Sequence, residues 1–152
     1  LLLNGALTIG TLDGANIEIR EQVGAENIFI FGMTAAEVEE KRRAGYSPGE
    51  VVKAIPDLAK TLELIDSGHF TPANLADGKP VVDRLLSEGE PFFVLADYAS
   101  YVATQDEADA LFLQPDEWSR KAVLNTLSMG TFSSDRSIRE YAQRIWRIKP
   151  VL

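Results

Sequence analysis

The sequence contains no cysteine and only one histidine. Without cysteine, disulfides, thiolate zinc sites and a cysteine nucleophile are excluded, and we expect a reducing, cytoplasmic location. With His69 alone, histidine relays and multi-histidine metal sites are excluded as well. His69 follows Gly68 where a helix is expected to end, and a cation suits that end of a helix. We therefore interpret His69 as structural rather than catalytic.

Positive charge and long apolar runs are also scarce. The chain has 15 Lys and Arg against 23 Asp and Glu, a net charge of −8, which argues against non-specific nucleic-acid binding. Its densest basic run, residues 41–43, follows Glu37, Glu39 and Glu40, a pattern typical of a solvated helix face. No apolar run is long enough to span a bilayer, and no basic region precedes the first leucines. We expect neither nucleic acid nor membrane as a partner.

What remains is the composition of a globular domain. The chain has 152 residues, of which 45% are apolar and 25% charged, enough for one domain with its own core. It begins without methionine, and Leu1-Leu2-Leu3 leads directly into Asn4-Gly5, as if a helix had been entered in its last turn. We expect the chain to be cut from a longer protein.

Three short apolar segments, residues 6–10, 27–32 and 92–95, predict β-strands. The second is apolar on both faces, which is typical of a central strand in a covered parallel sheet. About eight helices are expected around them. The predicted fold class is therefore a helix-rich α/β fold, with too few strands for a complete doubly wound domain and the missing ones upstream.

Capping patterns place the helices. Thr34 with Glu37 and Ser47 with Glu50 are capping boxes, and Pro48 occupies a first helical position. Apolar residues at helical spacing predict inward faces, among them those of the helices near the C-terminus. The predicted helices cover residues 13–23 after an Asp13 cap (although 17–20 also fits strand alternation), 35–43, 48–55, 56–67, 80–86 ended by Gly89, 98–112 capped by Asp97, 115–129 ended by Gly130, and 134–146.

Three glycines near the start raise the question of a phosphate-binding loop. Gly5, Gly10 and Gly14 are spaced five and four apart, which is neither the dinucleotide fingerprint nor a P-loop. Residues 11–16 offer backbone N–H groups at a helix N-terminus, where an anion is favoured, but Asp13 would repel a phosphate. We interpret the segment as strand-turn-helix packing, with a phosphate loop as the alternative.

The remaining candidate residues have structural explanations. Helix-dipole and solvated-face effects account for the acidic residues that suggest an acid/base pair or metal cluster. Aromatic residues at helical spacing indicate core rather than a sugar-stacking platform, and residues 133–136 indicate a helix cap because no histidine is near to activate a serine. The residues considered are Asp106, Glu107, Asp109, Asp116 and Glu117; Tyr98, Tyr101, Phe112, Trp118, Tyr141 and Trp146; and Ser133, Ser134, Asp135 and Arg136.

Residues 3–18 read Leu-Asn-Gly-Ala-Leu-Thr-Ile-Gly-Thr-Leu-Asp-Gly-Ala-Asn-Ile-Glu. This stretch resembles the segment of glycogen and other α-glucan phosphorylases that directly follows their pyridoxal-phosphate lysine. The resemblance covers essentially the whole chain and places it at the C-terminal end of a protein several times longer. Further matching segments, in the family's order, are residues 26–32, 44–46, 67–68, 70–72, 95–98, 118, 132–138, 141–142 and 145–146.

The resemblance implies a fold and a reaction. It implies a two-domain glycosyltransferase of the GT-B type, with residues 1–152 in the C-terminal portion of the second, cofactor-side Rossmann-like domain. In the parent enzyme, inorganic phosphate would cleave the terminal glucose from an α-1,4-glucan and release glucose 1-phosphate. The phosphate of the cofactor pyridoxal 5′-phosphate would act as the proton-relay partner of the substrate phosphate. The family also implies a homodimeric parent.

The family's signature assigns no catalytic, cofactor-binding or metal residue to this chain. It reads Glu-Ala-Ser-Gly-Thr-Gly-Asn-Met-Lys, then two variable residues, then Leu-Asn. Leu1 and Leu2 fill the variable pair, so the cofactor lysine is expected immediately before Leu1. We expect the chain alone to be inactive and to bind no cofactor. The alternatives are a non-catalytic helical interaction module derived from the phosphorylase framework and, less compatible with the unbroken resemblance, a glycosyltransferase that uses nucleotide-sugar donors.

Overall fold

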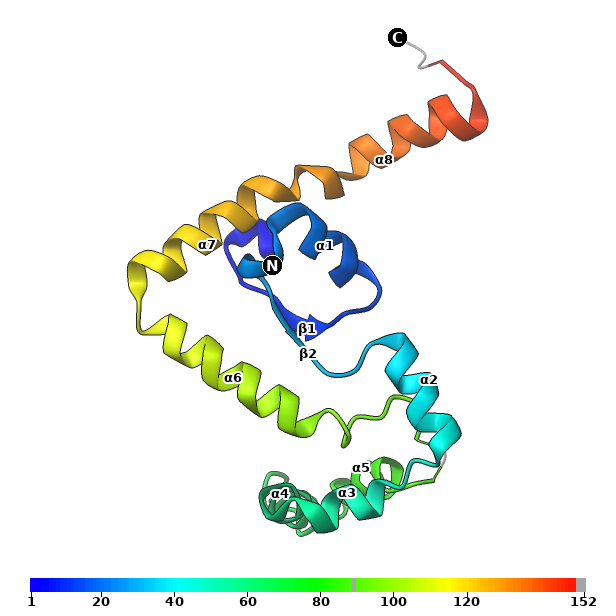
Figure 1. Ribbon diagram of the computed structural model, residues 1–152, viewed down its shortest axis with the longest axis vertical. Coiled ribbons are helices and arrows are strands. Elements are labelled where there is room, and N and C mark those ends of the chain that lie inside the picture. The colour runs from blue at the N-terminus through cyan, green and yellow to red at the C-terminus, as the bar shows by residue number, and fades with distance from the viewer. Residues whose placement is uncertain (89, 150–152) are drawn as a thin grey trace. The chain divides into compact units, whose positions relative to one another are not determined.

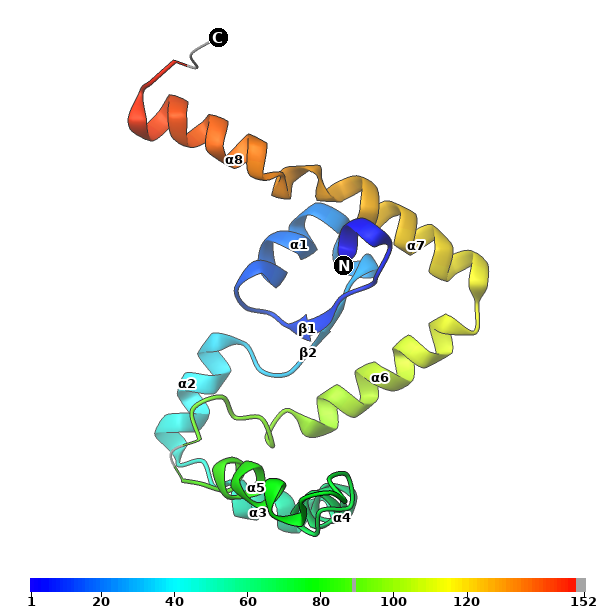
Figure 2. The ribbon, with the colours of Figure 1, turned by 180° about the vertical axis from the view of Figure 1, so that it is seen from behind.

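The computed structural model describes residues 1–88 and 90–149, a helix-rich α/β structure (Figures 1 and 2). Gly89, the expected end of one helix, lies outside the described residues. The elements in chain order are η1 (Leu2–Asn4), β1 (Ile9–Thr11), α1 (Ala15–Val23), η2 (Ala25–Asn27), β2 (Phe29–Phe31), α2 (Ala35–Ala44), α3 (Pro48–Ala54), α4 (Pro56–Asp66), η3 (Leu75–Asp77), α5 (Lys79–Leu85), α6 (Tyr98–Phe112), α7 (Pro115–Ser128), η4 (Met129–Phe132), α8 (Ser134–Glu140) and η5 (Tyr141–Trp146).

The chain forms two compact units. The first combines Leu1–Ile30 with the chain from Asp106 on, and the second is Phe31–Gln105. Each has its own cluster of buried apolar side chains. Within residues 1–88 and 90–149, none of the helices combines the length and apolarity that a bilayer crossing requires.

The first unit is built on a small βαβ arrangement. Strands β1 and β2 pair in parallel, and α1 makes the connection between them. The Phe29 N–H donates to the Thr8 carbonyl oxygen at 3.0 Å. Helices α1 and α7 lie side by side in both views (Figures 1 and 2). Their shared core is made of Ile19, Val23, Ile28 and Met129.

A fully buried amide connects α7 to the start of β2. The Asn125 side chain is 0% exposed, and its Nδ2 donates to the carbonyl oxygens of Asn27 and Lys121, both at 2.9 Å. Asn27 is also buried, and its Nδ2 donates to the Val23 carbonyl oxygen at 2.7 Å. Lys121 adds a hydrogen bond from its Nζ to the Glu26 carbonyl oxygen. The carbonyl oxygens of Asn27 and Val23 thereby gain side-chain hydrogen-bond partners in the interior.

The second unit is a helical cluster with a core between α4 and α5. Leu58 and Leu62 lie one turn apart on α4 and are 3% and 6% exposed. Val82 on α5 and Leu95 complete the buried set. The spacing of Leu58 and Leu62 is the helical period that the sequence predicted for residues 56–67.

The sequence prediction of three strands is wrong for one and imprecise for two. Residues 92–95 form a bend that leads into a turn, because Phe93 has a positive φ of 56°, outside the range of an extended strand. Strand β1 begins at Ile9 because Ala6 folds back, its N–H donating to the Leu1 carbonyl oxygen at 3.3 Å. Strand β2 begins at Phe29 because Ala25–Asn27 forms a tight helical turn.

Helix positions agree closely with the prediction, whereas side-chain caps and inward faces agree only in part. The capping box of Thr34 and Glu37 is confirmed, but Ser47 makes no side-chain cap bond and Gly14, not Asp13, precedes α1. The predicted helix is confirmed for residues 17–20, and the strand alternative is wrong. Periodicity also predicted several inward side chains that are exposed in the structure: Tyr101 41%, Val102 38%, Phe112 65%, Val123 57%, Leu127 76%, Ile138 55%, Tyr141 48%, Ile145 65% and Trp146 52%.

Substituting Thr34 by alanine tests the cap. The Thr34 N–H donates to Glu37 Oε2 at 2.7 Å, and the Glu37 N–H donates to Thr34 Oγ1 at 3.4 Å. We expect Thr34→Ala to lower the unfolding free energy by about 1 kcal/mol in urea denaturation. Ser47→Ala, at an N-cap position without a cap bond, is the matched control and should change it by less than about 0.5 kcal/mol. Equal losses in the two variants would contradict the assignment.

Candidate functional site

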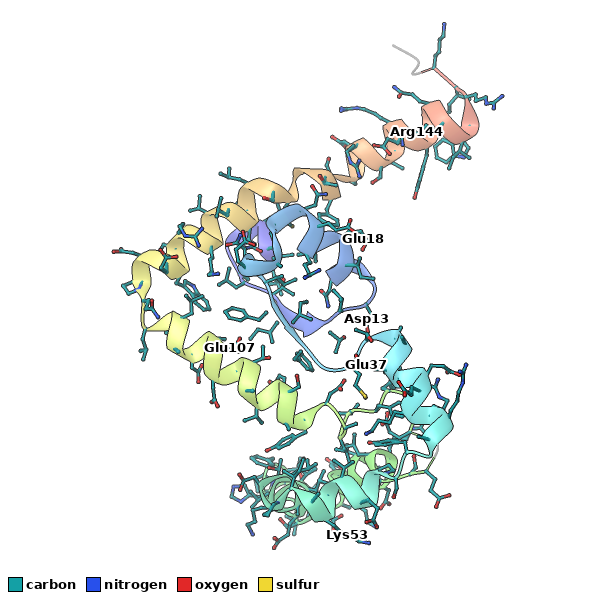
Figure 3. The ribbon with its side chains drawn as sticks, viewed as in Figure 1. Asp13, Glu18, Glu37, Lys53, Glu107 and Arg144 are labelled. Carbon is teal, nitrogen blue, oxygen red and sulfur yellow. The ribbon has the colours of Figure 1, made fainter. Side chains whose placement is uncertain are left out.

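The glycine-containing turn after β1 is closed on itself. The Asp13 N–H donates to the Thr11 carbonyl oxygen at 2.9 Å, and the Asn16 N–H donates to the Asp13 carbonyl oxygen at 3.0 Å. Thr11 Oγ1 donates to Asp13 Oδ2 at 3.1 Å. These N–H groups are therefore engaged within the turn, and an exposed carboxylate stands beside them (Figure 3). The geometry favours strand-turn-helix packing over a phosphate loop.

The close approach that this turn requires explains Gly10. The Asn16 side chain folds back over β1, and its Nδ2 donates to the Thr11 carbonyl oxygen at 2.9 Å. A Cβ on residue 10 would lie 2.5 Å from that Nδ2. Glycine at position 10 therefore makes room for a side-chain hydrogen bond that fixes the turn.

The acidic and histidine candidates remain dispersed. Glu107 is exposed on α6 (Figure 3). Glu117, in the first turn of α7, pairs with Arg120 at 2.9 Å. Among the residues that the structure describes, no three carboxylate or imidazole side chains gather into a group that could hold a metal ion. His69 is exposed and makes an edge-on contact with the Phe70 ring, with centroids 5.0 Å apart.

The serine and aromatic candidates that the structure describes have structural contacts rather than the arrangement of a catalytic or sugar-binding site. Ser133 precedes α8 but makes no side-chain cap bond, and its carbonyl oxygen accepts from the Ser137 N–H at 3.1 Å. Phe112 and Trp118 make an edge-on contact with ring centroids 5.1 Å apart. This pair joins the end of α6 to the first turn of α7 rather than forming an open stacking surface.

A cavity that the sequence did not predict lies in the second unit. Its volume is about 490 Å³, within the range of small-molecule sites. The Tyr46 and Phe93 rings stack with centroids 4.5 Å apart, and the Arg42 guanidinium lies 5.2 Å from the Phe93 centroid. The only sequence signal for it is the family-matching Gly45-Tyr46 pair. We call this the Tyr46 cavity; it is lined by Arg42, Gly45, Tyr46, Ser47, Glu88, Glu90, Pro91 and Phe93.

A buried carboxylate shapes one wall of the Tyr46 cavity. Glu90 is 5% exposed, and its two oxygens accept the N–H groups of Phe92 at 2.6 Å and Val94 at 3.1 Å. These bonds flank Phe93, whose backbone is left-handed and whose ring is 2% exposed. The Glu90 carboxylate thus stabilises a backbone conformation that is unfavourable for phenylalanine.

A second carboxylate, Asp97, anchors the chain after β2. Its Oδ1 accepts the Met33 N–H at 3.0 Å, and a Cβ on residue 32 would lie 2.5 Å from its Oδ2. Burial raises the pKa of the Asp97 carboxyl; the Met33 hydrogen bond and Lys41 oppose this, and the negative charge of Glu37 adds to it. Asp97 is therefore an ionisable side chain whose hydrogen bond connects residues 32–33 to the beginning of α6.

Comparison with known proteins gives one consistent match. Residues 1–148 match the family model described as Carbohydrate phosphorylase. The chain is 50% identical over 150 residues to a glycogen phosphorylase of Synechocystis sp. and 49% identical over 146 residues to one of Chlamydia trachomatis. It is 47% identical over 149 residues to the brain form of glycogen phosphorylase from Ovis aries. These matches cover 96% to 99% of this chain but only 18% of each relative.

Substituting Gly10 by alanine tests the packing role of the opening turn. The added Cβ displaces the Asn16 side chain and breaks its bond to the Thr11 carbonyl oxygen, so we expect a loss of about 1–3 kcal/mol of unfolding free energy. Gly130→Ala is the matched control, because a Cβ there meets nothing within 4 Å. Urea denaturation monitored by circular dichroism measures both. A neutral Gly10→Ala variant would refute the close approach.

Asp97→Asn tests whether ionisation of Asp97 changes the stability of the folded chain. Because the pKa of Asp97 is raised in the folded chain above its ordinary value of 3.8, the folded state binds the proton more tightly than the unfolded state. This contribution to stability is complete below the unfolded pKa and is lost as the pH rises through the folded pKa. The stability of the original chain relative to Asp97→Asn should therefore decrease from about pH 3 upwards. Denaturation at a series of pH values measures it, and a difference that grows with pH would contradict the assignment.

Proposed function

Because this chain belongs to the carbohydrate phosphorylase family, we propose that it forms the C-terminal framework of an α-glucan phosphorylase. Such an enzyme uses inorganic phosphate to release glucose 1-phosphate from an α-1,4-glucan. The observation that carries the proposal is the continuous family match over residues 1–148, supported by 50% identity to a glycogen phosphorylase. In this proposal the chain belongs to the cofactor-side domain, and the homodimer of the parent forms through other parts of the protein.

The role proposed for residues 1–5 is to hold the segment that follows the cofactor lysine. In this proposal the lysine stands immediately before Leu1. Thr126 Oγ1 on α7 donates to the Leu2 carbonyl oxygen at 3.3 Å, and the Gly5 N–H donates to the same oxygen at 3.0 Å. Leu2 also packs against the core of the first unit. Contacts from a helix far along the sequence thus fix the start of the chain.

Four of the described lysines have contacts that disfavour the attachment of pyridoxal phosphate. An imine-forming lysine requires an accessible neutral amine, favoured by a lowered pKa. Hydrogen bonds to Glu50 and Asp83 instead raise the pKa of Lys53 and Lys79. Lys60 pairs with Glu63 at 2.9 Å, and Lys121 donates to a carbonyl oxygen. We therefore derive no reaction step through the cofactor in this chain and propose a supporting role.

A second candidate function is a non-catalytic interaction module that keeps the phosphorylase framework. The observation that favours it is the exposure of large apolar side chains on the helices of the first unit and in the turn between α6 and α7. Leu113 is 81% exposed, Leu127 76% and Ile145 65%. In this reading those side chains form a protein-binding surface, and phosphorolysis plays no part.

An assay of glucose 1-phosphate formation distinguishes the two functions. The purified chain, supplied with pyridoxal phosphate, inorganic phosphate and maltoheptaose, should form no glucose 1-phosphate and show no Schiff-base absorption band after dialysis. A longer protein carrying the family signature directly before Leu1 should show both. Turnover by the chain alone would contradict the supporting role, and an inactive longer protein would favour the interaction module.

A further inference from the structure

We propose that the pair Asp13–Gly14 is a site of spontaneous covalent modification, at which the aspartate isomerises to isoaspartate. In an Asp-Gly pair the glycine nitrogen attacks the side-chain carboxyl carbon of the aspartate, because no Cβ on the second residue obstructs the approach. The sequence holds two Asp-Gly pairs, Asp13–Gly14 and Asp77–Gly78, and one Asn-Gly pair, Asn4–Gly5, which reacts in the same way. The fold leaves only the first of these three pairs open to the reaction.

The reaction needs no reagent besides water. The Gly14 nitrogen forms a bond to the side-chain carboxyl carbon of Asp13 and gives up its proton, and the carboxyl hydroxyl leaves with that proton as water. Water then opens the resulting succinimide ring at one of its two carbonyl carbons. Addition at the side-chain carbon restores aspartate, and addition at the main-chain carbon leaves isoaspartate, in which the chain runs through the side-chain carbon. The steps are a condensation and a hydrolysis, so no electron is transferred.

The nitrogen of Gly14 is accessible to the reacting carbon. Both residues of the Asp13–Gly14 pair are exposed. Gly14 has a φ of 48° and a ψ of −134°, a backbone conformation that side chains disfavour. No described residue accepts its N–H in a hydrogen bond, and a Cβ built on it meets nothing within 4 Å. The attacking atom is therefore neither occupied nor shielded.

The carboxyl group of Asp13 is held loosely beside this nitrogen. Thr11 Oγ1 donates to Asp13 Oδ2 at 3.1 Å, and both groups lie at the surface. Rotation about the Asp13 side-chain bonds brings the carboxyl carbon toward the Gly14 nitrogen. This motion breaks one exposed hydrogen bond and disturbs no buried apolar side chain, so it belongs to the low-energy openings of the fold.

The second Asp-Gly pair has the same chemistry but is held in place. Gly78 is buried, and a Cβ on it would overlap the Ile65 carbonyl oxygen, so the backbone of α4 packs directly against it. Asn74 Nδ2 donates to Asp77 Oδ1 at 2.5 Å and orients that carboxyl group. Reaction at Asp77 therefore requires this part of the second unit to open first.

The Asn-Gly pair is restrained by its own main chain. Asn4 is the last residue of the short helix η1, and the Gly5 N–H donates to the Leu2 carbonyl oxygen at 3.0 Å. The nitrogen that would attack the Asn4 side chain is thus engaged in a hydrogen bond. This bond must break before the ring can form, which slows deamidation at this pair.

Isoaspartate at position 13 would alter the turn that connects β1 to α1. The main chain gains a methylene group, and the former main-chain carbonyl becomes a free carboxylate. That carbonyl oxygen accepts the Asn16 N–H at 3.0 Å in the unmodified chain. The Asn16 side chain also fixes the turn through the Thr11 carbonyl oxygen. Loss of this register should make the modified chain unfold at a lower urea concentration.

Incubation of the folded chain for weeks in mildly acidic buffer, beside the same chain in guanidinium chloride, tests the proposal. Trypsin releases residues 1–20, which report on Asn4 and Asp13, and residues 61–84, which report on Asp77. Electron-transfer fragmentation in a mass spectrometer distinguishes isoaspartate from aspartate. We expect the rate at Asp13 to differ by less than about twofold between folded and unfolded chain, and the rate at Asp77 to be about tenfold lower in the folded one. The rate at Asn4 should also be lower in the folded chain.

Asp13→Glu is the control variant. Its longer side chain would have to close a larger and less favourable ring, so position 13 should no longer yield an isomer. Isomerisation at Asp77 should continue at its original rate. Absence of isoaspartate at position 13 of the original chain would overturn the proposal, as would a folded-to-unfolded rate ratio at Asp13 no higher than the ratios at Asn4 and Asp77.

Discussion

The buried amide of Asn125 is the interaction on which the first unit depends. Strands β1 and β2 have three residues each, and a two-stranded pair is marginal in water without a cover. Helix α7 supplies part of that cover, and Asn125 fixes its position by bonding the Asn27 carbonyl oxygen just before β2. Thr126, the next residue, bonds the Leu2 carbonyl oxygen. One turn of α7 therefore holds both the start of the chain and the entry to β2.

Two carboxylates, the buried Glu90 and the half-buried Asp97, serve the second unit in a comparable way. Glu90 accepts two backbone N–H groups and Asp97 accepts one, so irregular segments gain the main-chain partners that a sheet would have provided. Side-chain acceptors allow the backbone to turn at places where strand pairing would require it to be extended. The cost is burial of charge, which appears as the raised pKa of Asp97.

The sequence predicted what is local and missed what depends on distant partners. Proline at a first helical turn and the Thr34–Glu37 box act within one turn, so α2, α3 and α4 were located closely. Residues 92–95 have the composition of a strand, but Glu90 supplies acceptors that only the folded chain reveals. The Tyr46 cavity joins segments about forty residues apart, a proximity that periodicity does not encode. The family was recognisable because the resemblance extends along the chain rather than resting on one motif.

The left-handed backbone of Phe93 imposes a trade-off on directed evolution of the second unit. Glycine or asparagine at this position would relax a φ of 56°, but either would empty the space between Tyr46 and Arg42. Other aromatic residues would keep that space filled and retain the strain. A library randomised at this single position should therefore recover phenylalanine or a close analogue, whereas escape to a small residue requires a simultaneous enlargement on α2 or in the connection that follows it.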